Sequence, residues 1–119
     1  MEIRKSGEDY LETILTLRQQ KGAVRSVDVA EAMGFSKPSV SVAMKKLREN
    51  GFVTVDDDGA LSLTAEGEAL AQRIYHRHQV IVAMLTAVGV EPGTAAEEAC
   101  QIEHVISDDT LEKIRDYFK

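Results

Sequence analysis

The stretch that decides the fold is SVDVAEAMGFSKPSVSVAMKKLRENGFVTVDDDGALSLT, residues 26–64. Its first part carries the start and stop signals of two short helices. Ser26 is a favourable N-cap for the first of them, and Gly34 closes it. Ser36 caps the second, and Pro38 stands in its first turn, where a missing N–H costs no hydrogen bond. Two short helices joined by a tight glycine turn indicate a helix-turn-helix unit.

The second part of the stretch predicts a β-hairpin. Asn50-Gly51 stops the second helix, and Asp58-Gly59 is typical of a hairpin turn. Apolar residues on either side of that turn predict two strands, with Phe52, Val53 and Val55 in one and Leu61 and Leu63 in the other. A hairpin directly after these helices is the wing of a winged helix-turn-helix domain.

A further helix is predicted before this stretch, over residues 7–20. Its apolar residues share one arc at about 100° per residue. They are Tyr10, Leu11, Ile14, Leu15 and Leu17. This helix completes a winged helix-turn-helix domain over residues 1–63.

The rest of the chain, residues 64–119, is predicted to be a second, helical domain. Thr64 caps a long helix that reaches about Val88. Another helix is expected over 94–107, and a last one follows a cap at Asp108 or Asp109. The fold class is therefore mainly α, with a small β wing.

The helix that begins after Ser36 is expected to lie in the major groove of double-stranded DNA. Small hydroxyl side chains allow close approach to bases, and lysines reach phosphates. The predicted DNA-binding residues are Arg25, Ser36, Lys37, Pro38, Ser39, Ser41, Val42, Lys45 and Lys46. The alternative is a three-helix scaffold with a solvated basic face. Three aspartates, Asp56 to Asp58, make the wing tip a poor phosphate contact and are typical of a solvated turn.

Charge and composition set limits on function. The net charge of −6 hides an asymmetry, because residues 1–50 hold nine basic against seven acidic side chains and residues 51–119 five against thirteen. The front half suits a polyanion and the back half suits cations or a partner subunit. With 5% aromatic residues and no Trp, stacking on single strands is not expected.

The sequence also predicts where the protein works. No apolar run is long enough to span a membrane, the first ten residues contain no apolar signal region, and one cysteine suits a reducing compartment. A cytoplasmic protein without a membrane partner is expected.

The most informative chemical pattern lies in the helix predicted over 94–107. Cys100, Glu103 and His104 are spaced i, i+3, i+4, which places them on one helical face. The opposite face, with Ile102, Val105 and Ile106, is expected to point toward a core. Thiolate, carboxylate and imidazole together form a ligand set for first-row transition metals. The alternative is a buried cysteine beside a surface Glu and His.

Two other helices carry weaker signals of the same kind. Asp9 and Glu12 share a face turned away from the apolar arc of their helix, where a solvated acidic surface is the common explanation. His78 lies on the apolar stripe of the long helix, where a histidine is usually a core or interface residue. If the three helices converge, these residues join Cys100, Glu103 and His104 in a site for one or two metal ions.

With these residues in view, the chain resembles the diphtheria toxin repressor family of metal-dependent transcriptional regulators, especially its short manganese transport regulators. The resemblance covers essentially the whole chain, and its most specific segment is CQIEHVIS at 100–107. The other matching segments are EDYLETI at 8–14, SKPSVSVAMKKLRENGFV at 36–53, LTAEGEALA at 63–71 and YHRH at 75–78.

The resemblance implies a winged helix-turn-helix domain followed by a helical metal-binding and dimerisation domain. It implies a homodimer that reads a roughly palindromic operator, and a divalent cation as cofactor. The metal ligands it implies are Asp9, Glu12, His78, Cys100, Glu103 and His104.

Two of these residues mark a hybrid site. Cys100 matches the thiolate of the iron-type members, whereas Asp9 matches the carboxylate of the manganese-type members. Val82 and Ala96 stand at positions of the iron-type second site and cannot bind a metal. Hard oxygen donors favour Mn²⁺ and Fe²⁺, and a thiolate shifts the preference toward Fe²⁺, Co²⁺, Ni²⁺ or Zn²⁺. We expect Fe²⁺ or Mn²⁺ in the cell, with Zn²⁺, Co²⁺ or Ni²⁺ as substitutes in vitro.

Three rival functions follow from the same residues. The main alternative is a winged-helix regulator without metal control, whose DNA binding is indifferent to a chelator. An enzyme is not expected, because no glycine-rich elbow or phosphate-binding glycine motif accompanies Cys100. A structural zinc protein would usually show a more cysteine-rich ligand set.

Overall fold

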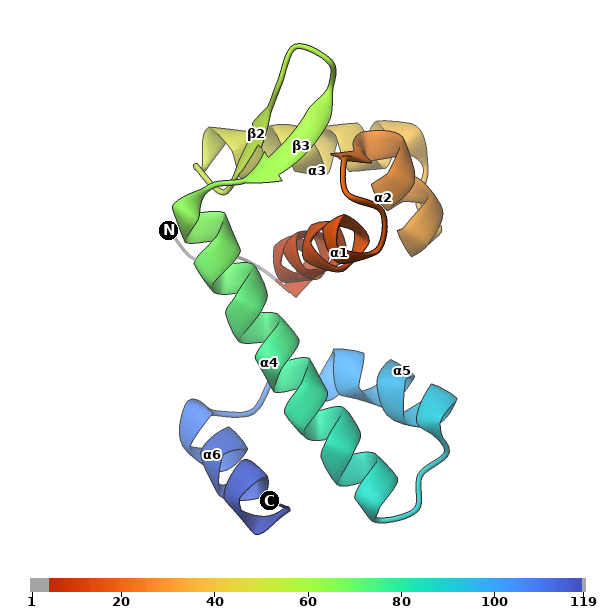
Figure 1. Cartoon of the computed structure of the whole chain (residues 1–119), viewed down its shortest axis with the longest axis vertical. Coiled ribbons are helices and arrows are strands. Elements are labelled where there is room, and N and C mark those ends of the chain that lie inside the picture. The colour runs from red at the N-terminus through yellow and green to blue at the C-terminus, as the bar shows by residue number, and fades with distance from the viewer. Residues whose placement is uncertain (1–4, 119) are drawn as a thin grey trace. The chain divides into compact units, whose positions relative to one another are not determined.

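The computed structural model describes residues 5–118 and is mainly helical, with one small sheet. The helices and strands follow one another along the chain as labelled in Figure 1. By its internal contacts the chain divides into two compact units, one ending at Gln72 and the other beginning at Arg73. The division falls within α4 (Ala65–Ala87). None of the helices in residues 5–118 combines the length and the apolar composition that a membrane crossing requires.

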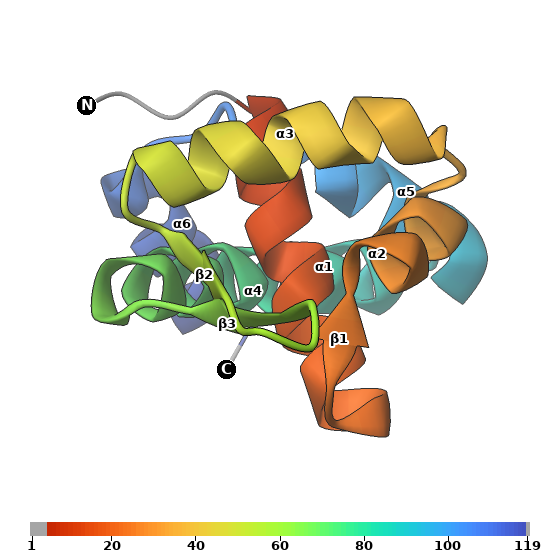
Figure 2. The same cartoon turned by 90° about the horizontal axis from the view of Figure 1, so that it is seen from above.

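The first unit contains a helix-turn-helix and a wing. Its helices are α1 (Lys5–Lys21), α2 (Ser26–Met33) and α3 (Lys37–Glu49). Its strands are β1 (Val24–Arg25), β2 (Val53–Val55) and β3 (Ala60–Leu63), in an antiparallel sheet of order β1-β3-β2. Figure 2 shows α3 crossing over α1, with the β2–β3 hairpin next to the end of α3. The predicted winged helix-turn-helix is therefore confirmed.

A continuous apolar core holds this unit together. Three residues of the predicted arc, Leu11, Ile14 and Leu15, are at most 1% exposed. Each neighbouring element adds a buried β-branched residue: Val24 from β1, Val29 from α2, Val40 from α3 and Val53 from β2. Burial of one such side chain stabilises a fold by about 1.5–3 kcal/mol, so this core fixes α3 by its inner face. The outer face of α3 is left to solvent.

Two details of the first unit differ from the sequence prediction. Ser26 is the first residue of α2 rather than its cap, and Arg25 holds the N-cap position. Instead of a capping hydroxyl, the Asp28 carboxylate accepts a hydrogen bond from the Arg25 backbone N–H at 2.9 Å. Phe52 precedes β2 rather than belonging to it, because its N–H and C=O bond Leu47 and Thr64 outside the ladder.

The second unit consists of three helical segments. The end of α4 is flanked by α5 (Pro92–Ile102) and α6 (Asp108–Tyr117), as Figure 1 shows. Ile81, Ala99 and Leu111 form the buried centre, one residue from each helix. Partly buried apolar residues surround this centre: Val80, Val82, Met84, Leu85, Ile102 and Ile106.

The structure of α5 and α6 corrects four predictions. α5 begins at Pro92, because Glu91 caps it by accepting the backbone N–H groups of Gly93 and Thr94 at 3.0 Å each. It ends at Ile102, so the predicted helix over 94–107 is too long. Val105, expected in the core, is 79% exposed. α6 is capped by Ser107, which accepts from the Thr110 N–H, rather than by Asp108 or Asp109.

Candidate metal centre and nucleic-acid interface

Three potential metal ligands gather inside the second unit. His78 of α4, Cys100 of α5 and Glu103 each offer a donor atom within 4.8 Å of the other two. The His78 Nδ1 lies 2.8 Å from Glu103 Oε2 and 3.9 Å from Cys100 Sγ. The sequence analysis placed His78 on one helix and Cys100 and Glu103 on another, and the structure brings the three together. Cys100 lies within α5, whereas Glu103 is the residue directly after its end.

The Glu103 carboxylate is the unusual member of this cluster. The residue is 1% exposed, and its Oε1 is a buried atom that accepts no hydrogen bond from the described part of the chain. A buried carboxylate oxygen is costly unless it is paired, hydrogen-bonded or bound to a metal. Imidazole nitrogen, thiolate sulfur and carboxylate oxygen form the mixed donor set of first-row transition metals. The residues present thus fit a divalent transition metal.

His104 lies beside this cluster in the same unit. Its Nε2 is 3.4 Å from Glu103 Oε1, and its side chain is 5% exposed. The Glu103 carboxylate thus has a histidine ring next to each of its two oxygens. Asp9 and Glu12 are partly buried residues of α1, in the first unit. Their role as ligands stays a prediction.

The local fold explains how Glu103 and His104 reach this place. α5 ends at Ile102, and Glu103 is its C-cap, with a backbone N–H that still bonds the Ala99 carbonyl at 2.9 Å. His104 therefore lies in the turn that follows, not on a continuing helix. The i, i+3, i+4 argument is right about Cys100 and Glu103, which are one turn apart, and wrong about a helical position for His104.

Sequence reasoning missed Arg77, the buried cation behind the cluster. The residue is 5% exposed. Its Nε donates to the Glu103 carbonyl at 2.8 Å, its Nη1 donates to Asp108 Oδ1 at 2.7 Å, and its Nη2 donates to the Ile106 carbonyl. Arg77 stands three residues after Ile74 and four before Ile81, both buried, so the helical period could have identified it as an inward-facing cation.

The predicted DNA-binding face of the first unit is exposed as a whole. α3 turns Val40, Met44 and Leu47 inward. The exposed residues include all nine predicted contacts: Arg25, Ser36, Lys37, Pro38, Ser39, Ser41, Val42, Lys45 and Lys46. Val42 is 57% exposed, and its apolar side chain suits contact with a thymine methyl. That these residues bind DNA stays a prediction.

The N-terminus of α3 is held in place by its own hydroxyls. Ser36 Oγ accepts from the Ser39 N–H at 3.3 Å and donates to Ser39 Oγ at 2.8 Å. These bonds confirm the predicted cap. At the wing tip, Asp56 Oδ1 accepts the N–H groups of Asp58 and Ala60 at 2.9 Å each, so this carboxylate closes the turn.

Comparison with known proteins assigns the chain to a family. Residues 2–61 match the model of the iron-dependent repressor N-terminal DNA-binding domain, and residues 64–119 match that of the iron-dependent repressor metal-binding and dimerisation domain. The chain belongs to the iron-dependent repressor family. Its fold is that of metal-dependent, DNA-binding transcriptional regulators, as the resemblance in the sequence implies.

Named relatives agree with this assignment. The transcriptional regulator MntR of Escherichia coli is 38% identical over 108 residues, which cover 91% of this chain and 70% of the relative. The HTH-type transcriptional regulator MntR of Shouchella clausii is 33% identical over 93% of this chain and 78% of its own length.

Solved structures show the same fold in longer proteins. The manganese regulator SloR matches with a TM-score of 0.81 and 31% identity, over 98% of this chain and 54% of its own. A manganese-dependent transcriptional repressor in complex with manganese matches with a TM-score of 0.86 and 29% identity, over 94% of this chain and 52% of its own. The chain thus spans about half the length of these proteins.

Proposed function

We propose that the chain is a metal-dependent, DNA-binding repressor that senses Fe²⁺ or Mn²⁺ and controls genes of metal homeostasis. The observation that carries the proposal is the buried Glu103 carboxylate, with its unsatisfied Oε1 and its neighbours His78 and Cys100. The exposed face of α3 supplies the DNA-binding surface. Membership of the iron-dependent repressor family supports both parts of the proposal.

The choice between Fe²⁺ and Mn²⁺ depends on Cys100. Two solved structures of similar fold, named as a manganese regulator and a manganese-dependent repressor, support Mn²⁺. A thiolate ligand favours Fe²⁺, and in vitro also Zn²⁺, Co²⁺ and Ni²⁺, over Mn²⁺. We propose that Cys100 binds directly, and that it moves the selectivity of an otherwise manganese-type ligand set toward Fe²⁺.

We further propose that Asp9 and Glu12 add hard oxygen ligands from the first unit. When bound, the cation supplies positive charge that neutralises the surrounding thiolate and carboxylates. Cys100 must lose its proton, and the histidines must be neutral, for these side chains to act as ligands. A metal ion that binds ligands from both units would favour the form of the protein that binds DNA. It can do so by no more than the difference between its affinities for the DNA-binding form and the non-binding form.

The partner we propose is double-stranded operator DNA, bound by a homodimer in the cytoplasm. The match of residues 64–119 to a metal-binding and dimerisation domain supports the dimer. A two-fold dimer reads two half-sites separated by whole helical turns, so a palindromic operator is expected. Lys45 and Lys46 would neutralise phosphates, which makes the affinity fall steeply with salt.

The experiment that tests the metal site is anaerobic equilibrium dialysis against Mn²⁺, Fe²⁺ and Zn²⁺, with metal counted per chain. The wild-type protein is compared with Cys100→Ala, and with Thr110→Ala as a control outside the cluster. We expect stoichiometric binding that Cys100→Ala weakens most for Fe²⁺ and Zn²⁺. Binding of all three metals unchanged by Cys100→Ala would make Cys100 a packing residue, and no binding by the wild type would refute a metal sensor.

A second experiment tests the coupling to DNA. Duplexes selected from a random pool with the Mn²⁺-loaded protein are used in binding titrations with metal or with a chelator. We expect Asp9→Ala and Glu103→Ala to abolish the metal dependence. If chelator leaves the wild-type affinity unchanged, the winged-helix regulator without metal control is the correct function.

A further inference from the structure

We infer that Arg77 is the positioning residue of the metal site. Its guanidinium holds the backbone of the turn that carries Glu103 and His104. Helix α4 would therefore supply one metal ligand, His78, and also the group that fixes the position of two others, Glu103 and His104. The inference rests on the proposed metal site. Arg77 acts through the turn, because its hydrogen bonds go to backbone carbonyls and to Asp108 and not to the Glu103 carboxylate.

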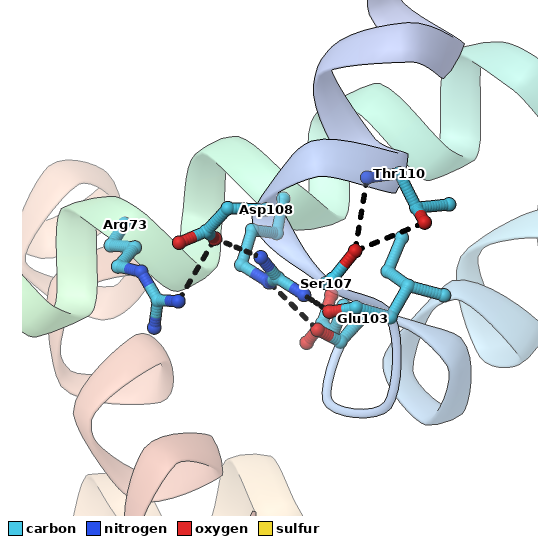
Figure 3. Close-up of polar contacts among 7 residues, drawn as sticks. Arg73, Glu103, Ser107, Asp108 and Thr110 are labelled. Carbon is cyan, nitrogen blue, oxygen red and sulfur yellow. Dashed lines mark hydrogen bonds and ion pairs between the residues drawn. The ribbon is translucent and has the colours of Figure 1, made fainter.

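Burial is the first reason to assign Arg77 this role. An arginine that is 5% exposed must have its charge and its donors satisfied by the protein. All three guanidinium nitrogens have an acceptor, and two of these acceptors are carbonyls of one short turn, Glu103 and Ile106. Figure 3 labels two residues that accept these hydrogen bonds, Glu103 in the turn and Asp108 at the start of α6. The guanidinium therefore fixes the turn on both sides of His104.

The end of α5 explains why the turn needs such a donor. The last carbonyls of a helix have no partner within the helix, and α5 ends at Ile102. Arg77 satisfies the Glu103 carbonyl at 2.8 Å and places positive charge near the negative end of the helix dipole. The planar guanidinium fork presents its donors in fixed directions, which a lysine ammonium cannot reproduce.

Charge balance shows that Arg77 can orient Glu103 without competing for it. The guanidinium pairs with Asp108 at 2.7 Å, which compensates its charge. The Glu103 carboxylate faces His78 through Oε2 at 2.8 Å and His104 through Oε1 at 3.4 Å, so both oxygens remain directed at the proposed ligands. Arg77 of α4 thus holds the backbone of Glu103, while the next residue of α4, His78, contacts the Glu103 side chain.

Arg73 provides a natural control for this role. It lies one helical turn earlier on α4 and donates to the same Asp108 oxygen at 2.9 Å (Figure 3). Its side chain is 52% exposed, and its hydrogen bond is to Asp108 alone among those of the described residues. If the ion pair with Asp108 were the important contact, substitutions of Arg73 and Arg77 would have similar effects.

The test is a Co²⁺ titration of Arg77→Lys and Arg77→Met, with Arg73→Lys and Arg73→Met as controls. Two quantities are measured: the dissociation constant, and the absorption spectrum with its thiolate-to-cobalt and ligand-field bands. Titrations are made at a temperature where circular dichroism shows each metal-free variant to be folded. Arg77→Lys keeps the charge and serves as the deciding variant if Arg77→Met does not fold.

We expect both Arg77 variants to bind Co²⁺ about 10–100-fold more weakly, the usual effect of losing an outer-shell partner, and to show altered ligand-field bands. The Arg73 variants should stay within about fivefold of the wild type, because exposed ion pairs contribute little. A spectrum and affinity unchanged in Arg77→Lys, or losses equal to those in Arg73→Lys, would overturn the inference. Absence of Co²⁺ binding by the wild type would instead refute the proposed metal site.

Discussion

Gly67 lies where the wing meets α4, and replacing it with alanine should weaken the first unit. A Cβ at this position would stand 2.0 Å from the Phe52 carbonyl oxygen and 2.9 Å from its carbon. The same carbonyl accepts the Thr64 N–H at 3.0 Å, and Thr64 Oγ1 donates to the Gly51 carbonyl at 2.6 Å. Only a residue without a Cβ allows this close approach of two backbones.

The size of the effect follows from these distances. The Phe52 carbonyl would have to withdraw from 2.0 Å to the 3.4 Å at which ordinary contact begins. Overpacking of this kind costs about 1–3 kcal/mol, and a lost hydrogen bond to Thr64 adds about 1 kcal/mol. The better helix propensity of alanine returns up to about 1 kcal/mol. We therefore expect Gly67→Ala to lower the free energy of unfolding by about 2 kcal/mol, or the melting temperature by about 10 °C.

Urea and thermal unfolding followed by circular dichroism measure this change. Gly93→Ala is the matched control, since its Cβ would meet only the carboxylate of the Glu91 side chain, at 3.1 Å, and no backbone atom. The helix propensity gained by alanine offsets a weakened Glu91 cap, so the control should change stability by less than about 1 kcal/mol. If Gly67→Ala were as stable as the wild type, the backbone contact between the wing and α4 would not exist as described, and the reasoning would fail.

Three further predictions concern metal, DNA and acid. Glu103→Gln should remove metal protection against thermal unfolding, which for the wild type at 100 times the dissociation constant is about 2.7 kcal/mol; equal protection would exclude Glu103 as a ligand. Lys45→Gln should weaken DNA binding evenly across sequences and reduce the slope of affinity against salt by about 1, and a change confined to one sequence would contradict a phosphate contact. Hydrogen bonds from Arg18 and then Gln72 lower the pKa of Glu68 below its ordinary value of 4.5. Ionised Glu68 therefore stabilises the folded state above pH 4.5, and this stabilisation is lost as pH falls through the lowered pKa. Glu68→Gln should lower the free energy of unfolding by less than about 1 kcal/mol at pH 6 and should not lower it in strong acid.

Features decided by neighbouring residues could be predicted from the sequence. Ser36 and Thr64 are caps because each hydroxyl accepts an N–H three residues ahead, a bond that needs no tertiary contact. The turn at Asp58-Gly59 follows from the left-handed conformation that Gly59 adopts, with φ of 85°. These local signals fixed the order of helices and hairpin, and with it the winged helix-turn-helix.

Features decided by distant residues could not. β1 is only two residues long, and Val24 and Arg25 are a strand because Leu61 and Ala60 pair with them. The end of α5 is a similar case. The residues after Ile102 continue the apolar periodicity, but their carbonyls bond Arg77 of α4 instead of continuing the helix. The tertiary contact overrides the local pattern, so the sequence predicted a helix that was too long.

The cluster itself shows how the two kinds of information combine. Residue types and spacing identified Cys100, Glu103 and His78 as chemically suited to one metal, but not the turn on which Glu103 and His104 lie. Adjacent residues on a helix point about 100° apart, so Arg77 and His78 reach different parts of the same turn. Arg77 meets the Glu103 carbonyl and His78 meets its carboxylate, at 2.8 Å in both cases. The register of α4 therefore sets the backbone position of Glu103 and the contact of its side chain together. A rotation of α4 would therefore disturb both contacts at once.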